Sequence, residues 1–102
     1  MLTGVRIDVD EAQIAELCRR HHVEKLWLFG SVLRDDFRPD SDVDVLVDFA
    51  PDARVSLWDV LRTRDALAQL FRREVDLVET AALENPFRRY EILRTRRLVY
   101  AA

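Results

Sequence analysis

The sequence predicts an α+β fold in which a small mixed β-sheet is flanked by helices. Short apolar or alternating segments have the length and spacing of strands, and they lie at Val23–Phe29, 42–49 and 74–78. Longer amphipathic segments have the spacing of helices, and they lie at 10–21, 56–73 and 85–97. A chain of 102 residues suits one compact unit, so we expect a single domain over residues 1–102.

The boundaries of the first two strands come from simple patterns. A continuous apolar run ends at Phe29, where Gly30 stops the strand, and a short helical turn is expected over 31–35. In the second strand side chains alternate between two faces. One face carries Val43, Val45, Val47 and Phe49, and the other carries Asp42, Asp44, Leu46 and Asp48.

Capping residues mark the starts of the helices. Asp10 is suited to cap the first helix, with Gln13 placed for a capping box. Asn85 followed by Pro86 is a typical start for the last helix. The core-facing residues are expected to be Ile14, Leu17 and Cys18 in the first helix and Leu57, Val60, Leu61, Leu67 and Phe71 in the second. Residues 98–100 would either add an edge strand to the sheet or pack against the rest of the domain without forming a strand.

Composition narrows the class of protein. The net charge of −3 argues against direct binding to nucleic acid over the whole surface. No apolar run approaches membrane length, so no membrane partner is expected. The single cysteine, Cys18, excludes an internal disulfide and favours a reduced, cytoplasmic protein.

Asp42 and Asp44 are candidate metal ligands. Alternation puts both on one face, with Cα atoms roughly 6.5 Å apart. Two carboxylates that close repel each other unless a cation lies between them. Mg²⁺ suits this position because it prefers oxygen ligands and completes its shell with water and phosphate. Taken alone, Asp-x-Asp is more often a solvated strand start.

Gly30 and Ser31 add a candidate phosphate-binding turn. A Gly directly after a strand lets backbone N–H groups approach an anion, and Ser31 adds a hydroxyl donor. Arg34, three residues later, is placed to reach the same phosphates. The simpler interpretations are an ordinary turn for Gly30-Ser31 and a surface ion pair for Arg34.

Asp76 is the third candidate acid. It lies within an apolar strand, where a charge is costly without a partner. A neighbouring strand carrying Asp42 and Asp44 would supply one through a shared metal, whereas an edge strand would simply expose it.

A basic run near the end of the sequence most simply forms a solvated helix face, or else a surface for an acidic partner or RNA backbone. It comprises Arg88, Arg89, Arg94, Arg96 and Arg97.

Together these residues resemble the nucleotidyltransferase superfamily that shares the DNA polymerase beta fold. Its pattern is Gly-Ser, ten residues, then Asp-x-Asp, and ten residues separate Ser31 from Asp42 here. Segments 29–36 and 39–44 resemble the motifs of the minimal nucleotidyltransferase (MNT) group, and the similarity continues through 75–78 and 99–100. One departure is Asp35, which stands where the motif usually has Gly and adds a negative charge near the phosphates.

The resemblance implies a specific chemistry and biology. Asp42, Asp44 and Asp76 would be the catalytic and metal-binding residues for two Mg²⁺ ions, and Gly30, Ser31 and Arg34 would bind the nucleotide. MNT proteins are antitoxins paired with HEPN-domain RNase toxins, and the expected reaction transfers AMP from ATP to a toxin tyrosine. An oligomer would form through the toxin complex.

Two alternatives remain open from the sequence. One is a non-catalytic antitoxin that inhibits the HEPN toxin by steric binding. The other is a nucleotidyltransferase acting on a small molecule or an RNA end. Tyr90 and Tyr100 also offer hydroxyls for self-modification.

Overall fold

The computed structural model describes residues 10–34, 38 and 41–102. Four strands form one sheet in the order β3-β2-β1-β4. Their bounds are Val23–Phe29 for β1, Val43–Phe49 for β2, Val75–Glu79 for β3 and Arg97–Ala101 for β4. The helices are α1 at Glu11–Arg20, α2 at Leu57–Phe71 and α3 at Pro86–Thr95, with short 3₁₀ helices η1 at Gly30–Leu33 and η2 at Thr80–Ala82. The predicted α+β fold is confirmed.

The sheet is mixed, as the sequence predicts. Strand β1 pairs antiparallel with both β2 and β4, whereas β2 and β3 run parallel. Parallel neighbours need a long crossover, and α2 supplies it between β2 and β3. The last residues do form an edge strand, β4, and the last helix ends at Thr95 rather than near Arg97.

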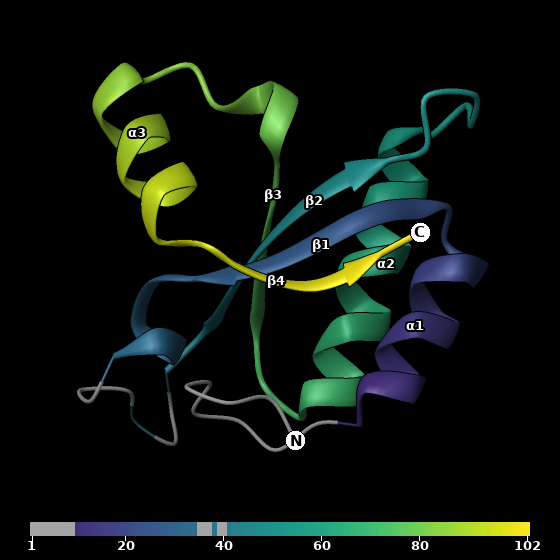
Figure 1. Cartoon of the computed structure of the whole chain (residues 1–102). Coiled ribbons are helices and arrows are strands. Elements are labelled where there is room, and N and C mark those ends of the chain that lie inside the picture. The colour runs from purple at the N-terminus through teal and green to yellow at the C-terminus, as the bar shows by residue number, and fades with distance from the viewer. Residues whose placement is uncertain (1–9, 35–37, 39–40) are drawn as a thin grey trace.

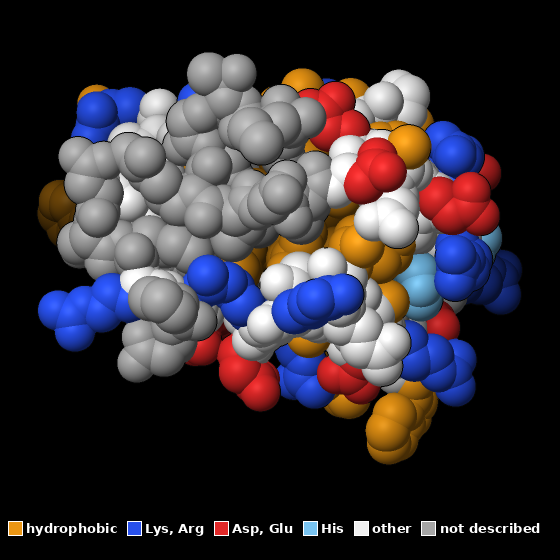
Figure 2. All heavy atoms as spheres, turned by 90° about the horizontal axis from the view of Figure 1, so that it is seen from below, with side chains coloured by type: hydrophobic (Ala, Val, Ile, Leu, Met, Phe, Trp, Pro, Cys, Tyr) orange, Lys and Arg blue, Asp and Glu red, His pale blue; other side chains and the backbone are white. Residues whose placement is uncertain are grey.

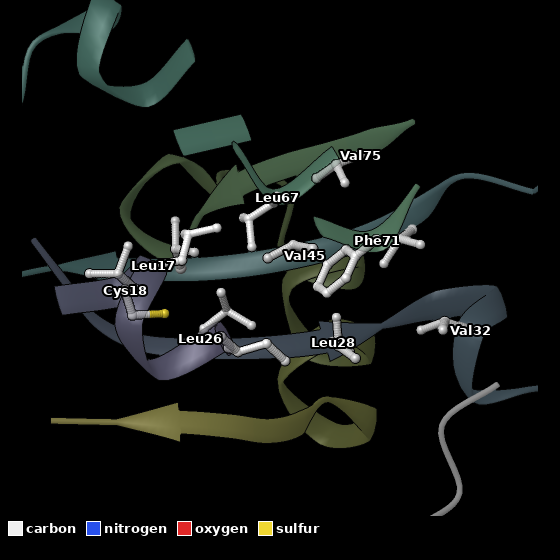
Figure 3. Packing of buried hydrophobic residues seen from close by; sticks show 13 residues of the cluster. Leu17, Cys18, Leu26, Leu28, Val32, Val45, Leu67, Phe71 and Val75 are labelled. Atoms are coloured by element: carbon white, nitrogen blue, oxygen red, sulfur yellow. The ribbon is translucent and has the colours of Figure 1, made fainter. Parts of the chain in front are cut away.

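Helices cover both faces of this sheet. Figure 1 shows α1 and α2 together beside one face and α3 beside the other. The larger core lies under α1 and α2 and is built from alternating strand residues (Figure 3); its labelled members are Leu17, Cys18, Leu26, Leu28, Val32, Val45, Leu67, Phe71 and Val75. A smaller cluster lies on the opposite face under η2 and α3, and it comprises Trp27, Phe29, Leu46, Leu83 and Ile92.

Side-chain caps fix the helix starts. Asp10 accepts a hydrogen bond from the backbone N–H of Ala12 at 2.8 Å, and Asn85 caps α3 through the N–H groups of residues 87 and 88. The predicted capping box with Gln13 does not form among the described residues, because Asp10 bonds to Ala12 instead. The box appears in α2, where Ser56 and Asp59 bond reciprocally.

The predicted core stripe of α2 is wrong at Leu57, whose side chain is 71% exposed. Its neighbour Trp58 is 70% exposed, although it points about 100° away around the helix. Exposure in two directions means that the first turn of α2 extends past the packed core. Thr63 is buried instead, and its hydroxyl donates to the carbonyl of Asp59 at 2.8 Å.

Within the described ranges, none of the helices has the length and apolar character needed to cross a bilayer. Figure 2 shows acidic and basic side chains interspersed over the described part of one face. That part of the surface therefore carries no broad field of one sign.

Candidate active site

The candidate site lies where the end of β1 meets the starts of β2 and β3. Asp44 pairs with Phe29 of β1 on one side and with Asp76 of β3 on the other. Residues in register on neighbouring strands share a face, so the carboxylates of Asp44 and Asp76 lie on the same side of the sheet. Asp42 immediately precedes β2 on the same alternation. The fold thus places the three predicted acids at the same end of the neighbouring strands β2 and β3.

Gly30 closes one side of Asp44. Its φ of +75° is left-handed, and a Cβ at this position would overlap the Oδ2 atom of Asp44. Only Gly combines that backbone with so close an approach. The turn continues as η1, where the N–H of Arg34 donates to the carbonyl of Ser31 at 2.9 Å. The predicted phosphate-binding turn therefore lies directly against Asp44.

The segment before Asp42 is tied to the base of β3. The Nη1 of Arg73 donates to the carbonyl of Arg38 at 2.7 Å and to that of Ser41 at 3.3 Å. The N–H of Val43 donates to the carbonyl of Glu74 at 2.9 Å. These bonds fix the position at which the chain enters β2. Asp35, Asp36, Pro39 and Asp40, which belong to the MNT-like motifs, lie outside the described residues.

Asp44 is the candidate acid whose ionised form is least favoured by its surroundings. It is half-buried, whereas Asp42 and Asp76 are exposed. Burial raises the pKa of Asp44 above its ordinary value, the negative charges of Asp76 and Asp42 raise it further, and Arg88 and Arg34 lower it in part. A carboxylate in this position is stabilised by a nearby cation.

These residues fit a magnesium ion by chemistry and by charge. All three side chains offer carboxylate oxygens, the donors that Mg²⁺ prefers. In the described part of the chain, no group of three or more His, Cys, Asp or Glu side chains is arranged to hold a metal by itself. Mg²⁺ usually takes only one or two carboxylates and fills its shell with water and substrate phosphates. Asp44 and Asp76, with the neighbouring Gly30 turn, meet that need.

A cleft of about 470 Å³ opens beside the turn. It is lined by Gly30, Leu33 and Arg34 from the η1 side and by Glu91 and Thr95 from α3. Arg34 therefore lies beside the Gly30 turn. The contribution of α3 was not predicted, because nothing in the local sequence pattern indicates that this helix lines a cleft beside the Gly30 turn.

Comparison with known protein families identifies the family of this chain. The family model described as a nucleotidyltransferase domain matches residues 11–99. The chain belongs to the nucleotidyltransferase domain family. Protein adenylyltransferase MntA of Thermococcus cleftensis is 37% identical over 86 residues, which cover 83% of this chain and 85% of that protein. The expected enzyme class, nucleotidyltransferase, is confirmed.

Solved structures agree with this assignment. A structure described as a minimal nucleotidyltransferase is 36% identical, with a TM-score of 0.69 and coverage of 84% of this chain and 85% of that one. A toxin–antitoxin structure with AMP-PNP has a TM-score of 0.72 at 19% identity, covering 92% and 75%. A complex of a tri-AMPylated Shewanella oneidensis HEPN toxin with its MNT antitoxin has a TM-score of 0.64 at 19% identity, covering 90% and 70%. The last two show the shared fold.

The basic run divides into residues with different surroundings. Arg89 donates to the carbonyl of Thr80 at 3.2 Å, and Arg94 pairs with Glu91 at 2.9 Å. The guanidinium of Arg96 lies 4.2 Å from the centre of the Trp27 ring. The interpretation of one solvated face is wrong for Arg96, which is half-buried because it stacks on the sheet.

Proposed function

We propose that this nucleotidyltransferase is an Mg²⁺-dependent antitoxin that transfers AMP from ATP to a tyrosine of a cognate HEPN toxin. The observation that carries the proposal is the register of Asp44 and Asp76 beside the Gly30 turn. Support for the donor and the partner comes from the relatives, one named a protein adenylyltransferase and others described as toxin–antitoxin complexes with AMP-PNP or an AMPylated HEPN toxin.

Each residue has a defined task in the proposed reaction. Asp42, Asp44 and Asp76 would hold Mg²⁺, which supplies charge neutralisation to the triphosphate and lowers the pKa of the attacking hydroxyl. Gly30, Ser31 and Arg34 would orient the phosphates. The tyrosine oxygen attacks the α-phosphorus, the bond to the pyrophosphate breaks, and pyrophosphate leaves.

Asp76 is the proposed acceptor of the tyrosine proton. It is exposed, in register with half-buried Asp44, and so lies on the side open to a protein substrate. A general base must reach the proton that it removes, and an exposed carboxylate can approach a tyrosine on a docked partner. Catalysis of this kind is mostly positioning and electrostatic stabilisation.

The test uses α-labelled ATP, Mg²⁺ and the cognate HEPN toxin. Label is expected on the toxin with the wild type and with Asp48→Asn, and it should be lost with Asp44→Asn. Asp48 is a matched control because it lies on the same strand and the same alternation as Asp44, four residues further along β2. Toxin inhibition that survives Asp44→Asn, without label in any sample, would instead support steric binding.

A further inference from the structure

Three contacts position helix α3. Its N-terminal half is tied through Arg89 to the carbonyl of Thr80 in η2 at 3.2 Å. Its middle is anchored by Ile92, which is 5% exposed in the smaller apolar cluster. Beyond its C-terminal end, the capping residue Arg96 stacks at 4.2 Å on Trp27 of β1. The orientation of the helix over this face of the sheet is therefore fixed by three independent contacts.

This orientation determines which side of α3 faces the site. Residues three and four apart lie on one helix face, with Cβ atoms about 5–6 Å apart. Arg88 precedes the cleft residue Glu91 by three positions and the buried Ile92 by four. Ile92 packs with Leu46, which follows Asp44 on the same side of β2. Arg88 is thus one helical turn from the cleft wall, on a helix that covers the same face of the sheet as the acids.

The electrostatics of Asp44 agree with this placement. The positive charge of Arg88 acts on the carboxylate of Asp44, as does that of Arg34. The two arginines come from separate parts of the chain, η1 and α3, that both border the cleft. Positive charge from two parts of the chain therefore acts on Asp44.

Arg88 also differs from the other arginines of α3 and from Arg96, which follows the helix. Arg89 and Arg94 donate to protein oxygens, and Arg96 stacks on an aromatic ring. Across residues 10–34, 38 and 41–102, no salt bridge or side-chain hydrogen bond engages Arg88, and it is exposed. A guanidinium with its donors available beside a cleft is suited to a phosphate group.

We propose that Arg88 binds the phosphates of the nucleotide donor from the α3 side of the cleft, facing Arg34. The inference rests on the proposed function and deepens it, because it adds a phosphate ligand outside the Gly-Ser and Asp-x-Asp motifs. It also gives α3 a role, because the three contacts that position this helix would hold a phosphate-binding side chain near Asp44.

The experiment measures ATP affinity by calorimetry with the intact chain in Mg²⁺, without a toxin. A hydrogen bond to a charged group contributes roughly 1.5–3 kcal/mol, so Arg88→Gln should weaken ATP binding about tenfold to a hundredfold. Arg64→Gln is the matched control, since it removes the same charge from α2, and Arg64 is engaged by Asp65 at 3.2 Å. Its ATP affinity should equal that of the wild type.

Arg88→Lys separates ligand binding from structure. Lysine keeps the charge but loses the forked donors, so its affinity should fall between those of the wild type and Arg88→Gln, at an unchanged melting temperature. Wild-type ATP affinity in Arg88→Gln would overturn the inference and leave the proposed function standing. An equal loss in Arg64→Gln would also overturn it. Failure of the wild type itself to bind ATP would overturn both.

Discussion

Gly30→Ala is the change that tests the site most directly. The backbone at Gly30 has φ +75°, and an Ala in a left-handed conformation costs about 1–2 kcal/mol. The new Cβ would also overlap Oδ2 of Asp44, so that carboxylate must rotate away. Forcing a side chain off its rotamer costs about 0.5–1.5 kcal/mol. The expected destabilisation is roughly 1.5–3.5 kcal/mol.

Thermal unfolding and AMP transfer measure the two consequences separately. In a domain of this size each kcal/mol lowers the melting temperature by about 4–8 °C, so a decrease of at least about 6 °C is expected. Displacing a catalytic group by about 1 Å can cost about a hundredfold in rate. AMP transfer should therefore fall by that order, even at temperatures where the Gly30→Ala protein is fully folded.

A double-mutant cycle with Asp44→Ala isolates the close approach. Without the carboxylate the added Cβ meets no oxygen, so Gly30→Ala should then cost only the backbone contribution, and the difference between backgrounds should be about 0.5–1.5 kcal/mol. Equal costs in the two backgrounds would refute the predicted overlap. An unchanged melting temperature in Gly30→Ala would refute the whole argument.

Three further predictions concern Asp44 itself, the larger core and the cap of α2. Burial and neighbouring carboxylates raise the pKa of Asp44 above its ordinary value of 3.8, so the ionised form of Asp44 destabilises the fold. Asp44→Asn should therefore raise the melting temperature at neutral pH without Mg²⁺. If this increase in melting temperature did not become smaller as the pH falls towards 3.8, the prediction would be contradicted. Burial raises the pKa of the Cys18 thiol to about 12, so a thiol reagent should label it only after denaturation, and labelling of the folded protein would count against a closed core. Ser56→Ala removes the α2 capping box and should cost about 1 kcal/mol in denaturant unfolding. AMP transfer by Ser56→Ala should be unchanged, since α2 covers the sheet face away from Asp44; reduced transfer would show coupling between the two faces.

Local patterns were sufficient for most element boundaries. The bounds of β1 match the prediction because a continuous apolar run is followed at once by a Gly with positive φ. The start of α3 matches because Asn85 caps it and Pro86 fits its first position. Leu57 shows the limit of this reasoning. Its helical periodicity favours the core, but nothing in a local pattern records where the core ends and the first turn of α2 projects beyond it.

The candidate site divides in the same way. The spacing of Gly30, Ser31, Asp42 and Asp44 is local, and the chemistry of paired carboxylates beside a turn follows from it. Arg88 could not be separated from the other arginines of its helix by sequence, because all of them fit a solvated face. Its distinction depends on which side of α3 meets the sheet, and that is decided by Ile92 and Arg96 packing on residues far away in the chain.

By itself, the sequence determined most of the strand and helix segments, the α+β class and the acids and turn of the candidate site. These follow from side-chain periodicity, backbone preference and charge within a few residues. Only the tertiary structure decided that β3 lies beside β2 with Asp76 in register with Asp44, and that α3 closes the cleft. Strand pairing and helix docking depend on burial shared between segments distant along the chain, and no local pattern contains that information.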